Sequence, residues 1–132
     1  PGLRFVSKLN TENDKQKLSL AAVELAESLG ARCIVVITRR GVMADLVCNC
    51  RPVYSDIYAF TNVSQARRTM TLGRGIRPFR IAFSQDPEKT LQTAFNVLKE
   101  REGFQSDEKV VVISDVLAGS GKIDAIQIRH LP

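Results

Sequence analysis

The sequence has few of the residues from which metal sites, disulfide frameworks and nucleophilic catalytic sites are built. Its 132 residues include three cysteines, one histidine and no tryptophan. An odd number of cysteines does not fit a disulfide framework. Cys48 and Cys50 form a C-x-C pair, but no second cysteine pair or nearby histidine completes a zinc ligand set. We therefore expect no metal site built by this chain.

Long hydrophobic runs are also absent. The longest, Cys33–Ile37 and Val110–Ile113, are far shorter than the roughly 20 residues that span a bilayer. The chain does not open on a basic stretch followed by an apolar one, which would indicate a secretory signal. We expect a cytoplasmic protein with no membrane contact.

What is present is the composition of one globular domain with a basic surface. Hydrophobic residues make up 44% of the chain and charged residues 25%, and the length fits a single domain. The net charge is +5 and the sequence pI is near 9.4. This balance fits a nucleic-acid partner, a phosphorylated small molecule or simply a basic surface.

Hydrophobic periodicity predicts strands that alternate with helices. Predicted helices cover residues 15–29, 42–50, 64–72 and 86–102, and predicted strands cover residues 32–38, 56–60, 76–83, 109–114 and 125–130. Such alternation is typical of an α/β fold, here a three-layer sandwich with about five strands, mostly parallel. The last strand should be antiparallel, because only a short loop precedes it. Residues 1–14 are expected to be a linker or a remnant of a longer chain, and residues 15–132 the domain.

Two loops are candidates for phosphate binding, because ligands of open α/β sheets bind beyond the carboxyl ends of the strands. The first loop, Thr38-Arg39-Arg40-Gly41, combines a hydroxyl, two guanidinium groups and a glycine ahead of a helix. The second loop, Gly119-Ser120-Gly121-Lys122, is small and carries a cation. Placed at the same edge of the predicted sheet, the two loops predict a phosphate-binding groove.

No group of residues can be assigned the roles of nucleophile and base. The chain has no G-x-S-x-G elbow, and its acidic residues are scattered. The lone histidine, His130, has no partner in a recognisable pattern. The chain by itself is not expected to be an enzyme.

A basic cluster raises a nucleic-acid hypothesis. Its members are Arg67, Arg68, Arg74, Arg77 and Arg80. Aromatic residues that would stack on single-stranded bases are not interleaved with them, so a charged face or a subunit contact is the favoured interpretation.

Several motifs occur in an order that indicates a known family. The most specific is the stretch of Gln65–Arg68 and Leu72–Pro78, with Thr61 ahead of it. The other motifs are Ala21–Val23, Ala31–Thr38 with Gly41 and Ala44, Arg51-Pro52, Lys109–Ser114 and Gly119–Gly121. Over about residues 18–132 these motifs resemble the C-terminal domain of pyruvate kinases.

The resemblance implies a parent enzyme with a separate catalytic barrel. In the family, that barrel transfers phosphate from phosphoenolpyruvate to ADP in glycolysis, giving pyruvate and ATP, with magnesium and usually potassium. The sequence contains none of the barrel, so no catalytic residue is carried over and this chain alone should be inactive. The C-terminal domain contacts the barrel and other subunits of a homotetramer. In many members it also holds an allosteric effector site for a sugar phosphate such as fructose 1,6-bisphosphate.

The first loop departs from the family pattern, although it keeps the first hydroxyl and the glycine. Arg40, Val42 and Met43 stand where the family has a hydroxyl, a cation and a second hydroxyl. Val116-Leu117 replaces a Trp-Arg pair of animal members, and Thr90 stands where the family has an arginine. Each charge-assisted hydrogen bond contributes roughly 1.5–3 kcal/mol, so the effector loop is degraded for a bisphosphate. A different effector, or none, is expected.

Two other hypotheses stay open beside a pyruvate kinase C-terminal domain. One is a stand-alone, non-catalytic module of the same fold that binds an anion or a metabolite. The other is a nucleic-acid binder that depends on the basic surface.

Overall fold

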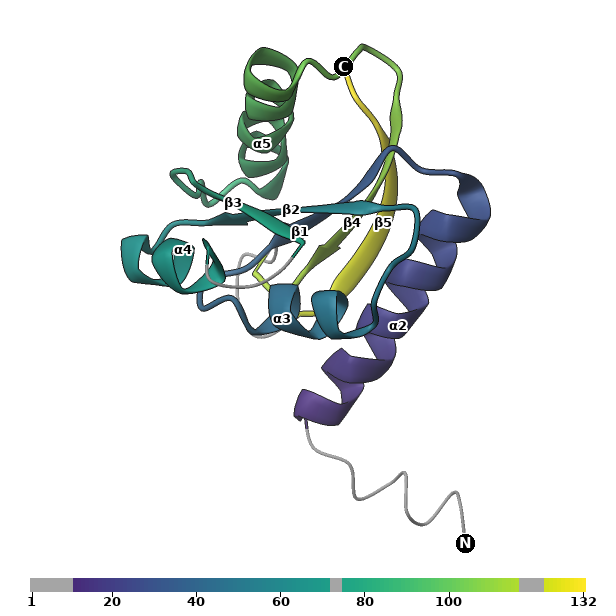
Figure 1. The fold of residues 1–132 in the computed structure, drawn as a ribbon. Coiled ribbons are helices and arrows are strands. Elements are labelled where there is room, and N and C mark those ends of the chain that lie inside the picture. The colour runs from purple at the N-terminus through teal and green to yellow at the C-terminus, as the bar shows by residue number, and fades with distance from the viewer. Residues whose placement is uncertain (1–10, 72–74, 117–122) are drawn as a thin grey trace, which may run out of the picture.

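A computed structural model describes residues 11–71, 75–116 and 123–132 of the chain. A five-stranded sheet with strand order β3-β2-β1-β4-β5 lies between two layers of helices (Figure 1). The elements are α2 (Thr11–Leu29), β1 (Cys33–Ile37), α3 (Val42–Asn49), β2 (Asp56–Thr61), α4 (Ser64–Thr71), β3 (Ile76–Arg80), α5 (Pro87–Glu102), β4 (Lys109–Ser114) and β5 (Ala125–His130). The predicted α/β sandwich is confirmed, and α2 begins within the residues predicted to be a linker.

Parallel pairing brings the strand ends together. β1 pairs in parallel with β2 and with β4, and β2 pairs in parallel with β3. β5 pairs antiparallel with β4, as predicted. The carboxyl ends of β1 to β4 and the start of β5 therefore lie along one side of the sheet, which we call the carboxyl edge.

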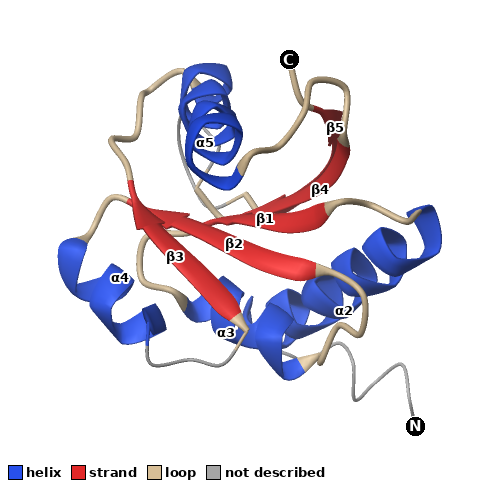
Figure 2. Cartoon of the chain, turned by 45° about the horizontal axis from the view of Figure 1, so that its top comes forward, coloured by secondary structure: helices blue, strands red, loops and turns tan. Residues whose placement is uncertain are grey.

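The sheet is covered on both faces, by α2, α3 and α4 on one side and by α5 on the other (Figure 2). The side chains of β1 alternate between the two layers. Ile34 and Val36 belong to the apolar cluster with α2, α3 and α4, whereas Cys33, Val35 and Ile37 belong to the cluster with α5. Burial on both faces explains why this strand is a continuous apolar run in the sequence.

The helix ends match their sequence signals. Gly30 follows α2 and Gly103 follows α5, with φ of +63° and +73°, a backbone conformation that glycine adopts at little cost. Asp86 precedes α5, and its side chain accepts a hydrogen bond from the amide of Glu88 at 3.0 Å. Pro87 occupies the first turn, where no amide donor is needed.

β3 is shorter than predicted, because it ends at Arg80 rather than Phe83. The amide of Ile81 still donates to the end of β2 at 2.8 Å, and the chain then turns toward α5. In that turn the amide of Ser84 donates to Oγ1 of Thr90 at 2.9 Å. A side-chain contact with the next helix thus takes the place of further sheet pairing.

Three arginines join the sheet to the α5 side of the molecule by one arrangement. Each guanidinium lies over an aromatic ring and forms an ion pair with a glutamate. The sets are Arg32 with Phe104 and Glu108, Arg77 with Tyr58 and Glu102, and Arg129 with Phe95 and Glu88. The hydrogen bond from Arg129 lowers the pKa of the Glu88 carboxyl. Since Arg77 belongs to the basic cluster, part of the positive charge of that cluster is paired with a carboxylate of the same domain.

Burial of the α5 face should contribute strongly to stability. Leu98 of α5 is 0% exposed, whereas Leu20 of α2 is 49% exposed. We expect Leu98→Ala to lower the free energy of unfolding by about 2–5 kcal/mol, because it leaves a cavity. Leu20→Ala, the matched control, should lower it by less than about 1 kcal/mol, because water already reaches that side chain. Urea denaturation measures both, and equal losses would contradict the assigned burial.

Candidate functional site

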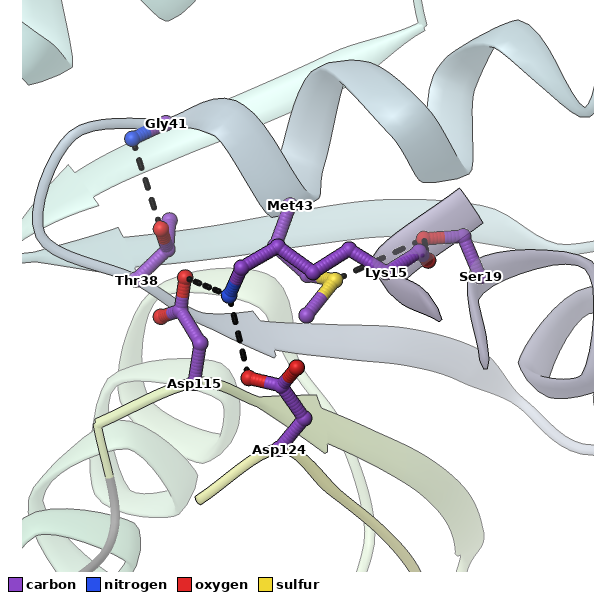
Figure 3. Close-up of polar contacts among 7 residues, drawn as sticks. All are labelled: Lys15, Ser19, Thr38, Gly41, Met43, Asp115 and Asp124. Atoms are coloured by element: carbon purple, nitrogen blue, oxygen red, sulfur yellow. Dashed lines mark hydrogen bonds and ion pairs between the residues drawn. The ribbon is translucent and has the colours of Figure 1, made fainter. Parts of the chain in front are cut away.

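The first candidate loop, residues 38–41, lies at the carboxyl edge between β1 and α3. Thr38 is 1% exposed, and its amide donates to the carbonyl of Phe60 at 3.0 Å. Its Oγ1 accepts a hydrogen bond from the amide of Gly41 at 3.3 Å (Figure 3). The hydroxyl of Thr38 therefore braces the loop from inside, and any ligand in solvent meets other groups first.

Two exposed arginines are carried on this braced backbone. The side chains of Arg39 and Arg40 are exposed, whereas the carbonyl of Arg39 accepts a hydrogen bond from Oγ1 of Thr61 at 2.7 Å. Thr61 is fully buried, and its Oγ1 also accepts from the amide of Val63 at 3.1 Å. A fixed backbone that presents two guanidinium groups suits an anion, because less of the loop has to be ordered on binding.

Gly41 begins α3 in a conformation that requires glycine. Its φ is +89°, and its carbonyl accepts the first helical hydrogen bond, from the amide of Asp45 at 3.0 Å. A β-carbon at this position would lie 3.1 Å from Cγ of Met70. Among the described residues no side chain caps the helix, and Asp45 in its first turn opposes the positive potential of the N-terminal dipole.

The second candidate loop lies outside the described residues, with its members Gly119, Ser120, Gly121 and Lys122. The flanking residues are described and meet at one lysine of α2. Nζ of Lys15 lies 3.1 Å from Oδ2 of Asp115, which follows β4, and 3.0 Å from Oδ1 of Asp124, which precedes β5 (Figure 3). We call these three residues the Lys15 cluster. Sequence reasoning missed it, because its members lie 100 and 109 residues apart and no local pattern links them.

The Lys15 cluster changes the charge expected at the carboxyl edge. One ammonium faces two carboxylates, which leaves one negative charge unbalanced within the cluster. Arg39 and Arg40 are therefore the described groups of the predicted site that can attract an anion, and they compete with that negative charge. Thr90, which stands in place of a family arginine, is 2% exposed and braces the turn before α5.

A cavity of about 520 Å³ lies away from the loop at residues 38–41, at the amino ends of β2 and β3. Its lining residues are Cys48, Asn49, Arg51, Pro52, Val53, Ser55, Asp56, Ile57 and Gly75. None of these lining residues belongs to the predicted phosphate-binding site. Burial raises the pKa of the neighbouring Cys50 thiol, which disfavours the reactive thiolate. Among the described residues, no group of three or more His, Cys, Asp or Glu side chains is placed to hold a metal ion.

The conformation of Gly41 gives a stability test with a matched control. Gly41→Ala and Gly30→Ala both place a β-carbon on a left-handed residue, which costs roughly 1–2 kcal/mol. At residue 30 the β-carbon would meet nothing within 4 Å, whereas at residue 41 it would press on Met70. We expect Gly41→Ala to lose more unfolding free energy than Gly30→Ala in urea denaturation. A smaller loss for Gly41→Ala would contradict the close approach of Met70.

Comparison with known proteins covers nearly the whole chain. The family model for "Pyruvate kinase, alpha/beta domain" matches residues 16–129. Chloroplastic pyruvate kinase isozyme A of Ricinus communis is 33% identical over 130 residues, which cover 98% of this chain and 21% of that protein. Its counterpart in Nicotiana tabacum is 32% identical over 122 residues, which cover 92% of this chain and 19% of that protein. This chain thus spans about a fifth of the length of these relatives.

A solved structure supports the same fold. Cryptosporidium parvum pyruvate kinase in complex with ADP superposes with a TM-score of 0.79 at 24% identity, covering 89% of this chain and 24% of that one. No helix in the described part of the chain is long and apolar enough to cross a membrane. The family match and the two relatives confirm the resemblance drawn from the motifs. The chain belongs to the pyruvate kinase family, in which it corresponds to the α/β domain.

Proposed function

We propose that this chain is the regulatory and assembly domain of a parent pyruvate kinase. The parent would transfer phosphate from phosphoenolpyruvate to ADP in glycolysis, giving pyruvate and ATP. The observation that carries the proposal is the match of residues 16–129 to the family's α/β domain, in a chain that spans about a fifth of its relatives. This α/β unit accounts for all the described residues, so catalysis is assigned to the rest of the parent.

The chemistry of that transfer belongs outside this chain. Magnesium and potassium are the ions expected for the parent enzyme, where they would neutralise the charge of the phosphates. This domain alone is expected to be inactive. Its location stays a prediction: the sequence favours the cytoplasm, whereas the Ricinus and Nicotiana relatives are chloroplastic by name.

The regulatory role rests on the braced loop at the carboxyl edge. Arg39 and Arg40 are exposed on a backbone that Thr38 and Thr61 hold in place, at the start of α3. The proposed effector is a phosphorylated small molecule, held by the two guanidinium groups rather than by the buried hydroxyl of Thr38. Its binding would alter how the domain packs against its neighbours and so change the activity of the barrel.

The assembly role rests on apolar groups left exposed at two places. Within the described residues β5 ends the sheet and pairs with β4 alone, and Ile128 on it is 49% exposed. Before β2, Val53 and Tyr54 are 76% and 86% exposed, while the Glu27 carboxylate accepts hydrogen bonds from both of their amides. Such preorganised apolar surfaces suit the proposed partners, which are the catalytic barrel and the other subunits of a homotetramer.

A stand-alone module of the same fold is the alternative. It is favoured because Arg40, Val42 and Met43 replace the hydroxyl and cationic residues of the family's effector loop. It is distinguished by the size of the native polypeptide in its source cells, measured by immunoblot with an antibody to this domain. A band several times larger than 14.6 kDa supports a parent enzyme. A band near that mass supports the stand-alone module.

Removal of the loop's exposed charges tests the effector proposal. We expect the double variant Arg39→Ala/Arg40→Ala to bind a sugar phosphate at least about tenfold more weakly by calorimetry, because each lost charge-assisted bond contributes roughly 1.5–3 kcal/mol. Fructose 1,6-bisphosphate and a panel of other sugar phosphates serve as probes. Arg101→Ala on the last turn of α5 removes another exposed positive charge and should change the affinity less than twofold. Equal affinity of the double variant and the wild type would remove the loop from the site.

A charge on the outer strand tests the assembly proposal. We expect Ile128→Asp to lower the association of the chain with itself by at least about tenfold in analytical ultracentrifugation, since it buries a carboxylate at the contact. Val63→Asp, at a residue 41% exposed ahead of α4, is the control and should associate like the wild type. If the wild type is a monomer at all concentrations, or if both variants associate equally, β5 is not the surface through which copies of this chain associate.

A further inference from the structure

The Lys15 cluster joins segments that are far apart in the sequence. Lys15 lies in the second turn of α2, Asp115 directly follows β4 and Asp124 directly precedes β5. The exposed fractions of the three side chains are 17%, 15% and 21%. Because one ammonium nitrogen binds both carboxylates, both bonds exist only while the end of β4 and the start of β5 stay close to each other and to α2.

The turn of α2 that carries Lys15 is itself fixed. The carbonyl of Lys15 accepts a hydrogen bond from Oγ of Ser19 at 2.7 Å, and that hydroxyl lies 3.4 Å from Sδ of Met43 in α3 (Figure 3). Ser19 and Met43 are both 0% exposed. On the other side, the amide of Asp115 lies 3.4 Å from the carbonyl of Ile37, the last residue of β1 before the candidate loop. The cluster thus links α2 to the backbone on both sides of the loop at residues 38–41.

Lys15 is the cation that both carboxylates contact. Oδ1 of Asp115 is buried and has no hydrogen-bond partner within the described residues, so the ammonium at Oδ2 is the group that stabilises this carboxylate. Ion pairs shielded from water interact more strongly than exposed ones, and loss of one partner leaves an uncompensated charge. Burial lowers the pKa of the Lys15 ammonium, but the hydrogen bonds and charges of Asp124 and Asp115 raise it by more. Lys15 is therefore charged throughout the neutral pH range.

We propose that Lys15 is a positioning residue that makes the start of α2 and the carboxyl edge one mechanical unit. A ligand at the loop of residues 38–41 that shifts the end of β4, through the contact of Asp115 with Ile37, then changes the order of the first turns of α2, the end of the helix that follows residues 1–10. By thermodynamic linkage, a constraint on the start of α2 acts back on the ligand with equal free energy. The ligand part of this inference rests on the proposed effector function, whereas the mechanical part does not.

Amide hydrogen exchange measured by mass spectrometry tests the mechanical part in the full chain without any ligand. We expect Lys15→Met to speed exchange at least roughly tenfold both in residues 15–22 of α2 and in residues 123–126, because both ends lose the shared cation. Lys17→Met removes the same charge from an exposed site two residues along the helix, and should change both segments less than twofold. Lys15→Arg keeps a cation with several donors and should restore both segments to within about threefold of the wild type.

The variants also separate linkage from general loss of stability. The triple variant Lys15→Met/Asp115→Asn/Asp124→Asn removes the ion pairs of the Lys15 cluster without leaving a buried charge unpaired, so it should fold. Residues 15–22 and 123–126 should still exchange faster than in the wild type. If this variant exchanges like the wild type, the cluster links nothing. If Lys15→Met loosens α2 alone, or loosens all segments equally, the proposal is also overturned.

A second measurement tests the ligand part, with fructose 1,6-bisphosphate and the panel of other sugar phosphates as probes. In the wild type, the bound probe should slow exchange in residues 15–22 as well as in residues 37–41. In Lys15→Met it should slow exchange only in residues 37–41. Binding that leaves α2 unchanged in the wild type overturns the role of Lys15 in transmission. Failure of every sugar phosphate in the panel to bind overturns the proposed effector function and the ligand part together, and the exchange of the unliganded variants still decides the mechanical part.

Discussion

Burial of β1 on both faces and along both edges is the constraint on which the rest of the molecule depends. All five of its side chains are 0% exposed, and β2 and β4 flank it in parallel. A strand enclosed in this way can present chemistry only at its end, where the chain leaves the sheet. The groups proposed to bind the effector therefore lie at the carboxyl edge, while the sheet itself provides stability.

At that edge the structure combines a rigid backbone with groups of opposite charge. Thr38 and Thr61 are buried and hold the loop through their hydroxyl oxygens, so that Arg39 and Arg40 stand on a fixed support. At the same edge of the sheet, Lys15 balances one of two carboxylates. An anion bound here would be attracted by the arginines and opposed by the remaining negative charge and by Asp45 in the first turn of α3.

The sequence contained enough information to predict the fold, but not the long-range contacts around the candidate site. Strand runs such as residues 33–37, and the glycines at 30 and 103, carry local signals, and the structure agrees with them. The loop at residues 38–41 could be predicted as a candidate because it follows a buried strand. That the Thr38 hydroxyl is used inside the loop could not be predicted, since it depends on the path from β1 to α3. The Lys15 cluster and the three arginine–aromatic–glutamate sets are long-range contacts, which leave no periodic pattern.

The most direct test of the central claim is phosphoenolpyruvate-dependent formation of ATP by the native polypeptide that carries this domain. The polypeptide is isolated from its source cells with an antibody to the domain, and is assayed with magnesium and potassium, with and without the panel of sugar phosphates. If this chain is the regulatory domain of a pyruvate kinase, we expect the polypeptide to form ATP at a rate that a sugar phosphate changes. Absence of ATP formation under all of these conditions would contradict the claim.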